Sequence, residues 1–559
     1  MEKIFLGIDV GTNSVRVGAF NQEGQLRGKA EHRIRIWRPR PDFVEQSSEE
    51  IWGATGKATR MCLTSGGIDP GSVKGLSFDA TCSLVALGDG LRPITVSPTK
   101  MQNQNVIVWM DHRATRQAEA INRTGHEVLR YVGGRISPEM EPPKLMWLKE
   151  NLPDTWKGAR KFMDLVDYMV YRSSGNDLRS LCTTVCKWTY LGHEGDSGSY
   201  RADFFEQIGI PDLFAGNRVP HMSHPMGESA GELTSTAAKE LGLPKGIPVG
   251  VGIIDAHAGG IGSFGPVLEG SEKVEDAFDR AIALIGGTSS CHMAVSSSPR
   301  FISGVWGPYY GAMIPGMWLN EGGQSATGSL IDLVIKDNSS YMKISKDAKA
   351  EGVDIYTYLN GIVKKKKDQY GLEIASKLHM LPYHHGNRSP RADPFARGMV
   401  SGLTLSSTPD DVALWYYATI QAIAYGTRHI IEAMDEKGYD IRQIYLCGGH
   451  LKNDLFIHEH ADITGCDVIL PEELEAVLLG AAILGAVAAG EFSDVLRAMR
   501  AMCRVSRVVH PDTSTTSFHE VKYDIFKEMY GFQRKIHERM GTVGNPLGNP
   551  QRKGRGEEQ

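Results

Sequence analysis

One local pattern occurs twice in this chain, at positions 276 residues apart. A buried strand, a Gly-Thr turn at 11–12 and a second strand open the sequence, and the same order returns around Gly287-Thr288. A strand–turn–strand unit that recurs at long spacing indicates a duplicated domain. The repeat therefore predicts two similar domains that flank a cleft, each opening with a β-hairpin loop.

Alternating strand and helix patterns surround these hairpins. Helical spacing runs over 48–63, with Ser47 or Ser48 as N-cap and two glutamates in the first turn. Residues 247–254 form an apolar strand that ends at Asp255. Further strands are predicted at 4–10, 15–20, 26–36, 73–78 and from 281 onward. The alternation favours an α/β fold.

Changes in composition divide the chain. The predicted parts are an N-terminal domain of 1–263, a linker and hinge at 264–280, a second domain of 281–490, a helical extension of 491–540 and a tail of 541–559. The tail is rich in Gly, Pro and charge, so we expect it to be disordered. The apolar, Gly/Ala-rich run at 476–490 is too short to span a membrane and is interpreted as a buried helix.

Charge and cysteine content exclude several classes of function. The net charge is −5, so there is no basic excess for nucleic-acid or membrane binding. Eight scattered cysteines without a CxxC pair favour a reduced compartment. The N-terminal apolar run is too short for a signal peptide, and Asp9 interrupts it. We expect a cytoplasmic protein with a small-molecule substrate; the oligomeric state stays open, with a homodimer among the options.

The first hairpin turn has the residues of a phosphate loop. Gly11 lets backbone N–H groups point at phosphate oxygens, and Thr12 and Ser14 add hydroxyl donors. Asp9 at the strand end can hold Mg²⁺, directly or through water. An ordinary glycine turn is the alternative, and the second copy at 287–288 favours phosphate binding.

Other motifs leave more than one interpretation. Gly448-Gly449 fits either a nucleotide contact or a plain turn, and Asp255 fits either a used acid or a helix N-cap. No GxxxxGK[ST] loop occurs. The GxGxxG at 260–265 is interpreted as a flexible connection. Cys182 and Cys186, spaced i, i+4, lack two further ligands nearby in sequence and are interpreted as buried thiols.

Four segments in this order resemble the FGGY carbohydrate kinases of the actin-like ATPase superfamily, which have two ribonuclease H-like domains. They are DVGTNSVR (9–16), GIIDAHAGG (252–260), GGTSS (286–290) and CGGHLKND (447–454). The resemblance covers about residues 4–490. Four more segments are similar to the D-ribulokinase branch, which phosphorylates D-ribulose at O5: FDATCSLV (78–85), WMDHR (109–113), VCKWTY (185–190) and LNEGGQS (319–325).

The resemblance implies a role for each matching residue. Asp255 is the implied general base, and Asp9 the implied Mg²⁺ residue. The implied ATP-binding residues are Gly11, Thr12, Asn13, Ser14, Arg16, Gly287, Thr288, Gly328, Gly448, Gly449 and Asn453. The implied sugar-binding residues are Ala80, Thr81, Trp109, Asp111, Lys187 and Glu321.

The sequence also departs from relatives of that family. Ala80-Thr81 stands where glycerol kinases carry an Arg-Glu pair, and Ala256 stands where they carry Gln, which counts against glycerol. His450-Leu451 differs from the commoner small residues of the adenosine loop and puts the nucleotide affinity in question.

The sequence therefore predicts an ATP- and Mg²⁺-dependent phosphotransferase that converts D-ribulose to D-ribulose 5-phosphate. Kinases for ribitol, L-ribulose or D-xylulose are the first alternative. A non-catalytic actin-like sensor of ATP or sugar is the second, and the intact Asp9, Thr12, Asp255 and Thr288 argue against it. We also expect the two domains to close on the sugar and exclude water.

Overall fold

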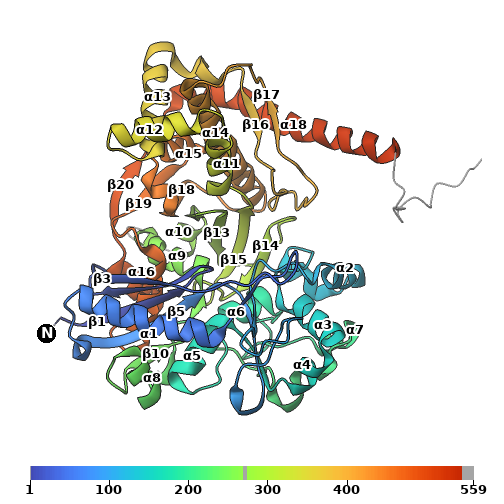
Figure 1. The fold of residues 1–559 in the computed structure, drawn as a ribbon, viewed down its shortest axis with the longest axis vertical. Coiled ribbons are helices and arrows are strands. Elements are labelled where there is room, and N and C mark those ends of the chain that lie inside the picture. Colours follow the sequence, from blue (N-terminus) through green and yellow to red (C-terminus); the bar gives the residue numbers. More distant parts are fainter. Residues whose placement is uncertain (1, 269–273, 544–559) are drawn as a thin grey trace, which may run out of the picture.

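Two sheets of similar topology lie one above the other in the computed structural model of the chain (Figure 1). The structure describes residues 2–268 and 274–543. Most of the predicted tail, and part of the predicted hinge, lie outside these residues. Figure 1 shows the N-terminal sheet in the lower part and the C-terminal sheet in the upper part.

The N-terminal sheet has the strand order β3-β2-β1-β5-β10-β9, with β11 beside β5. Strands β1, β2 and β3 form an antiparallel meander, and β5 runs parallel to β1. All seven residues of β1 are buried, which fits its apolar sequence. The strands are β1 (Ile4–Val10), β2 (Ser14–Phe20), β3 (Leu26–Arg33), β5 (Val73–Ala80), β9 (Ser229–Glu232), β10 (Pro248–Gly250) and β11 (Ile253–Ile254).

The C-terminal sheet repeats this arrangement. Its order is β14-β15-β13-β12-β18-β19-β20, again with an antiparallel meander (β12, β13, β15) followed by parallel strands (β18, β19). The strands are β12 (Ala281–Gly286), β13 (Ser290–Ser296), β14 (Trp306–Tyr310), β15 (Trp318–Gln324), β18 (Gln443–Gly448), β19 (Asp467–Pro471) and β20 (Val505–Val509). The duplication predicted from the two Gly-Thr turns and the α/β class predicted from the alternating strands and helices are both confirmed.

Helices and two small sheets complete both parts. The lower part contains α1 (Ser48–Ser65), α2 (Thr115–Thr124), α3 (Glu141–Asn151), α4 (Pro153–Gly158), α5 (Leu165–Ser174), α6 (Leu181–Lys187), α7 (Ala202–Gln207), α8 (Ser235–Leu241), β4 (Glu45–Gln46), β6 (Leu84–Leu87), β7 (Val106–Ile107) and β8 (Lys161–Asp164). The upper part contains α10 (Val274–Phe278), α11 (Gly328–Lys336), α12 (Tyr341–Ala350), α13 (Ile355–Tyr370), α14 (Pro409–Asp435), α15 (Asp454–Thr464), α18 (Thr516–Val543), β16 (His379–Leu381) and β17 (Met399–Ser401). Helix α1 has the predicted N-cap, because the Ser47 side chain accepts from the Glu50 backbone N–H.

Two helices join the halves of the chain. Helix α9 (Asp255–Phe264) packs against α16 (Ala476–Ala488), and α16 also covers β1 and β5 of the N-terminal sheet. A Cβ atom at Gly480 would lie 2.0 Å from the Ala258 carbonyl oxygen, and one at Gly262 would lie 1.9 Å from that of Ala476. The 260–265 motif thus lies at the C-terminal end of α9 and contributes to its close packing against α16. The interpretation of this motif as a flexible connection was wrong.

The apolar run at 476–490 forms a buried helix, as predicted. Helix α16 comes from the second half of the sequence but lies on the first sheet, with α17 (Val495–Met502) packed against it. The predicted helical extension also contains a strand, β20, which pairs with β19 at the sheet edge. The sequence boundaries of 281–490 and 491–540 thus do not coincide with the two sheets.

The predicted strand at 247–254 is divided into β10 and β11. A Cβ atom at Gly252, between them, would lie 2.6 Å from the Phe78 carbonyl oxygen, so only glycine permits this approach to β5. The Ser180 hydroxyl donates to the Gly252 carbonyl over 2.7 Å and occupies the backbone acceptor. The interruption between β10 and β11 changes the direction of the chain, and Asp255 then begins α9 directly after β11.

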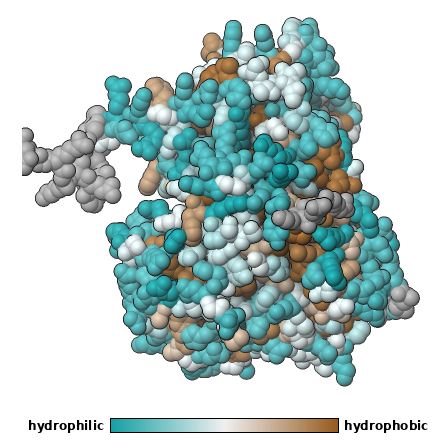
Figure 2. Space-filling view, turned by 180° about the vertical axis from the view of Figure 1, so that it is seen from behind, coloured by the Kyte–Doolittle hydropathy of each residue, from teal (hydrophilic) through white to brown (hydrophobic). Residues whose placement is uncertain are grey.

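Polar and apolar residues are unevenly distributed over the surface. Figure 2 shows that hydrophilic residues cover most of the back face, and that hydrophobic residues gather near the junction of the two parts. Within residues 2–268 and 274–543, no helix combines the length and apolar character that a membrane span requires.

Candidate active site

Three acidic residues meet at one edge of the N-terminal sheet. Strand pairing places Asp9 of β1 opposite Asp79 of β5, and Asp79 opposite Ile253 of β11, two residues before Asp255. The carboxyl ends of parallel strands lie at the same edge, where α/β proteins bind ligands. Asp255 stays half-buried, and its Oδ1 accepts from the Ala256 backbone N–H over 2.7 Å.

Burial and mutual repulsion change the acidity of this group. Burial raises the pKa of Asp255 to about 6, and the negative charge of Asp9 adds to the shift. Burial also raises the pKa of Asp79 well above its usual value, with the charges of Asp9 and Asp255 acting in the same direction. A carboxylate whose pKa lies near 6 is ionised at neutral pH and is basic enough to accept a proton.

Asp9 has a fixed cationic partner. The Arg16 Nε donates to Asp9 Oδ2 over 2.7 Å, and its Nη2 contacts the same oxygen. The Arg16 Nη1 also donates to Glu475 Oε2 over 3.2 Å, just before α16. Arg16 is thus the cationic partner that orients the Asp9 carboxyl group, and it lies beside the first Gly-Thr loop.

The first loop is tied to a predicted sugar-binding residue. The Gly11 N–H donates to the Ser14 carbonyl over 3.0 Å, which leaves Thr12 and the exposed Asn13 at the tip of the turn. The Trp109 Nε1 donates to the Thr12 hydroxyl over 3.0 Å. A residue predicted to bind phosphate and a residue predicted to bind sugar are therefore in direct contact.

Ala80 and Thr81 continue from β5 toward the same place. Ala80 is buried at the strand end, and the Thr81 N–H donates to the Val10 carbonyl over 3.1 Å. The Thr81 hydroxyl lies 3.2 Å from that of Ser83, whose oxygen also accepts from the Trp109 N–H over 3.2 Å. Small buried side chains thus follow Asp79 at this strand end.

The second loop is built from glycines that touch. Gly287 and Thr288 are exposed at the turn between β12 and β13, and the Gly328 N–H donates to the Gly287 carbonyl over 3.1 Å. A Cβ atom at Gly328 would lie 2.5 Å from the Gly287 oxygen, and one at Gly448 would lie 2.3 Å from the Gly286 oxygen. The predicted nucleotide residues of three distant segments thus meet, with the exposed Gly449 next to them.

The two hairpins differ in charge. The position that corresponds to Asp9 in the second copy is Ile285, and the position that corresponds to Arg16 is His292. Of the two turns, only the N-terminal one therefore has a carboxylate at this position, so a cation that needs oxygen ligands would be held from that side.

His450 is a functional candidate that sequence reasoning noted only as a departure. Its buried ring stacks on Phe456 at 4.2 Å between centroids. Its Nε2 lies 3.4 Å from the Thr327 hydroxyl, next to Gly286 and Gly328. Burial lowers the pKa of His450 to about 4, so the ring is neutral and acts as a wall of the loop cluster.

Asn453 has mainly a structural environment. Its side chain caps α15 by accepting from the Phe456 N–H over 3.3 Å, and its amide donates to the Tyr416 hydroxyl over 2.7 Å. It is buried. The cap fixes where the segment after Gly448-Gly449 turns into a helix.

The sugar-side residues Lys187 and Glu321 come together from different halves of the chain. Lys187 ends α6, and its ammonium lies 4.8 Å from the centroid of the Trp306 ring. Arg388 lies over the same ring at 4.0 Å and donates to Glu321 Oε1 over 3.3 Å. Burial alone would raise the pKa of Glu321, but the charges of Arg388 and Lys187 lower it below its usual value.

Arg388 and Glu139 were missed by sequence reasoning. Arg388 lies between β16 and β17, 67 residues from Glu321, and Glu139 precedes α3. Burial would raise the pKa of Glu139, but the contact with His112 and the charges of Arg388 and Lys187 lower it to about 2. No local motif connects these residues, so only the folded chain brings them together.

Asp111 lies in a separate buried cluster. Its two oxygens accept from Arg113 over 2.8 and 2.7 Å, and Oδ2 also accepts from the Val44 N–H over 2.6 Å. Arg113 continues to Glu45 at 2.8 Å. The structure thus places Asp111 where it holds the Trp109 segment, and its predicted contact with sugar stays a prediction.

Two family profiles together match most of the chain. Residues 4–262 match the N-terminal domain of the FGGY family of carbohydrate kinases, and residues 282–489 match its C-terminal domain. The chain belongs to the FGGY family of carbohydrate kinases. It is an ATP-dependent sugar kinase, and the family predicted from the sequence motifs is confirmed.

Relatives of this kinase match along its whole length. An FGGY carbohydrate kinase domain-containing protein of Xenopus laevis is 49% identical over 551 residues, which is 97% of this chain and 99% of the relative. A D-ribulokinase of Saccharomyces cerevisiae is 37% identical over 527 residues, which is 89% of this chain and 74% of the relative. The crystal structure of xylulose kinase from Rhodospirillum rubrum covers 96% of this chain and is itself covered completely, with a TM-score of 0.77 and 19% identity. This likeness confirms the predicted actin-like ATPase fold.

Asp79 lies at the same strand edge, although no motif in the sequence singled it out. It is fully buried, and neither of its carboxyl oxygens receives a hydrogen bond from a donor among the described residues. An acid inside an apolar strand is costly unless it is used, and this was its only signal in the sequence. Its position beside Asp9 makes it part of the acidic edge.

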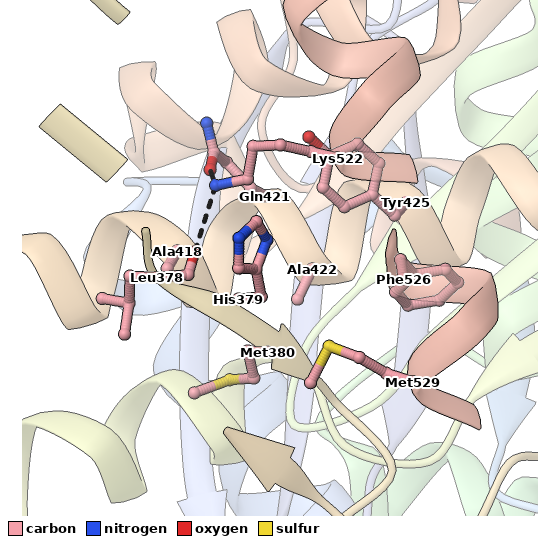
Figure 3. Close-up of a pocket in the computed structure, with 10 residues that line it drawn as sticks. All are labelled: Leu378, His379, Met380, Ala418, Gln421, Ala422, Tyr425, Lys522, Phe526 and Met529. Atoms are coloured by element: carbon pink, nitrogen blue, oxygen red, sulfur yellow. Dashed lines mark hydrogen bonds between the residues drawn. The ribbon is translucent and has the colours of Figure 1, made fainter. Parts of the chain in front are cut away.

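A small pocket elsewhere in the kinase has no free polar group. Figure 3 shows it between β16, α14 and α18, with Lys522 and Gln421 side by side. The Lys522 ammonium donates to Gln421 Oε1 over 2.8 Å and to the carbonyls of Ala375 and Leu378 over 2.8 and 3.2 Å. Burial lowers the pKa of Lys522 to about 8. The pocket lies in the C-terminal part and contributes to packing there.

Proposed function

We propose that this kinase transfers the γ-phosphoryl group of ATP to the O5 hydroxyl of D-ribulose and releases D-ribulose 5-phosphate. The observation that carries the proposal is Asp255, a half-buried carboxylate with a raised pKa at the edge that also holds Asp9 and the first Gly-Thr loop. The 37% identity to a yeast D-ribulokinase supports the choice of sugar. The resemblance of the sugar-facing segments supports it too.

The residues of the site fit the chemistry of phosphoryl transfer. Asp255 would accept the proton of the primary hydroxyl as the new O–P bond forms. Thr12 and Thr288 would donate hydroxyl hydrogens to phosphate oxygens, together with the backbone N–H groups of their loops. Lys187 and Glu321 would bind sugar hydroxyls with fixed direction, which selects one sugar better than apolar contacts can.

The acidic edge also fits a magnesium ion. Carboxylate oxygens are the ligands that Mg²⁺ prefers, and Asp79 offers two buried oxygens without a donor among the described residues. We propose that Asp9 holds Mg²⁺, directly or through water, with Asp79 behind it. When bound with ATP, the ion supplies neutralisation of the charge on the phosphates.

Two other functions are kept as alternatives. The same site could take ribitol, L-ribulose or D-xylulose, since all present a primary hydroxyl among several others. A non-catalytic sensor would need the loops but no base. The acidic edge with Asp255 favours catalysis over sensing, because burying three carboxyl groups together costs free energy that a sensor has no need to spend.

The sugar is tested by ADP release from purified protein with MgATP. The panel contains D-ribulose, L-ribulose, D-xylulose, ribitol, glycerol and no sugar. Turnover with D-ribulose that clearly exceeds all others supports the proposal. A preference for another polyol would keep the kinase and reject the specificity, and ATP binding without turnover on any sugar would favour the sensor.

The pH dependence should report Asp255. We expect kcat/KM for the sugar to fall as the pH drops through about 6, because the protonated carboxyl can no longer accept the hydroxyl proton. Initial rates measured between about pH 5 and 8 would show the decrease on the acid side of that pKa. A rate that stays flat to about pH 5 would contradict this assignment.

Thr288→Ala should destabilise the transition state of phosphoryl transfer more than the bound substrates. Thr288 is exposed at its loop tip, so removing its hydroxyl leaves the fold intact but removes one donor to the phosphates. We expect kcat to fall by about 10- to 100-fold with little change in sugar affinity. Thr236→Ala, an exposed threonine on α8, is the matched control. An effect confined to the sugar affinity would contradict the placement.

The proposed compartment is the cytoplasm. All eight cysteines of the chain are free thiols in the structure, and seven of them are buried. A chain with this many unpaired thiols fits a reducing environment.

A further inference from the structure

Two cysteines and a histidine lie together beneath the sugar-side residues. Cys182 and Cys186 are one turn apart on α6, and His257 lies in the first turn of α9. One ligand atom from each residue lies within 4.8 Å of the other two, and all three residues are buried. The two cysteines are interpreted as buried thiols from the sequence alone, because the third member of the group lies 71 residues from Cys186.

We propose that Cys182, Cys186 and His257 bind one Zn²⁺ ion, with the fourth coordination position open to water. Zinc bonds of about 2.3 Å to sulfur and about 2.0 Å to nitrogen, in a tetrahedral arrangement, place the two ligand atoms about 3.6 Å apart. The Cys186 Sγ lies 3.7 Å from the His257 Nε2. This sulfur–nitrogen distance is close to that of a shared tetrahedral zinc ion, and the ligand atom of Cys182 lies within 4.8 Å of both atoms.

The buried imidazole would bind the ion through one defined nitrogen. His257 is 1% exposed, and its Nε2 lies 3.7 Å from the Cys186 Sγ. The Nδ1 has no hydrogen-bond partner among the described residues, and it would keep its hydrogen while Nε2 binds the ion. His257 therefore supplies the nitrogen ligand of the group.

The charges balance when zinc binds. Each cysteine thiol loses its proton to solvent, so two thiolates neutralise one Zn²⁺ and the buried site gains no net charge. Lys187 follows Cys186 directly, and its ammonium lies 4.8 Å from the centroid of the Trp306 ring. Soft thiolate and imidazole ligands select zinc over the Mg²⁺ that the acidic edge would hold.

The position of the ion would tie together two parts of the kinase site. Cys186 is next to the sugar-side Lys187, and His257 is two residues after the base Asp255. A bond network through one ion would fix the distance between α6 and α9. The ion is thus a positioning element for the base and the ammonium, and it takes no part in phosphoryl transfer. This inference does not depend on which sugar the kinase uses.

Metal content tests the site without any reading of activity. Untagged, reduced protein is loaded with Zn²⁺, desalted and measured for zinc per chain. We expect about one zinc per chain in the unchanged protein. The same content is expected in Cys62→Ser, which removes an equally buried thiol on α1, and near none in Cys182→Ser or Cys186→Ser. Equal retention in Cys186→Ser, or no retention in the unchanged protein, would overturn the proposal.

Cobalt decides the question even if the variants fail to fold. Co²⁺ added to the unchanged, zinc-free protein should give the near-ultraviolet thiolate-to-cobalt absorption and the visible bands of a tetrahedral site. Zn²⁺ should then remove both signals by displacement. A spectrum without thiolate absorption would place the cobalt at oxygen ligands and would reject the proposed site.

Discussion

Replacing Asp255 with asparagine should lower kcat by about 10²- to 10⁴-fold, the range that a positioned general base contributes. The amide has the size of the carboxyl group but cannot accept the hydroxyl proton at neutral pH. Asp255 is half-buried and accepts a hydrogen bond only from the neighbouring Ala256 N–H, which the amide oxygen can keep. The fold and the sugar affinity should therefore change little.

Two measurements separate the base from a binding residue. Steady-state ADP release gives kcat, and calorimetric titration of the sugar into the same protein gives its affinity. Asp337→Asn, an exposed aspartate after α11, controls for the charge change. A variant with near-normal kcat would reject Asp255 as the base, and a loss of sugar affinity without loss of kcat would move it to the binding residues.

The hairpins and strand ends of the site could be predicted from the sequence because their chemistry is local. Asp9 lies at the end of one apolar strand, Asp255 directly follows another, and the Gly-Thr turns repeat 276 residues apart. Strand pairing then brings these acidic residues together, because the carboxyl ends of parallel strands lie at the same edge of a sheet. These predictions needed no knowledge of distant contacts.

Contacts between segments that are far apart in the chain could not be predicted from the sequence in this way. Arg388 reaches Glu321 across 67 residues, and Gly262 and Gly480 serve a helix crossing whose two members lie far apart in the chain. A glycine in a motif looks the same whether it binds phosphate or allows a helix to approach. The 260–265 motif was therefore interpreted as a flexible connection, whereas its neighbours in space make it a packing surface.

For Asp111 the family resemblance predicts a role, but the sequence does not predict the contacts of its side chain. The resemblance placed it on the sugar, but the sequence does not reveal that Arg113, two residues later, returns to bond both of its oxygens. A buried carboxylate with a bidentate arginine partner is already satisfied. The residue type of Asp111 could be matched to a family from the sequence, but its hydrogen-bond partners could be identified only in the folded chain.

Gly448→Ala should be the most damaging change in the nucleotide half of the site. Gly448 has φ of +90° and ψ of −160°, a region that is essentially restricted to glycine and costs other residues about 1–3 kcal/mol. An added Cβ atom would also lie 2.3 Å from the Gly286 carbonyl oxygen. Strands β12 and β18 would have to separate, and the Gly287-Thr288 loop would move with β12.

We therefore expect kcat/KM for ATP to fall about 100-fold or more, which corresponds to about 2.7 kcal/mol. The sugar affinity without nucleotide should stay close to normal, because Lys187 and Glu321 do not contact this strand pair. Gly361→Ala is the matched control: its Cβ meets open space on α13, so activity should be unchanged and stability should rise by about 0.5–1 kcal/mol. Equal kinetics in the two variants would show that the close approach of Gly448 to Gly286 does not shape the ATP site.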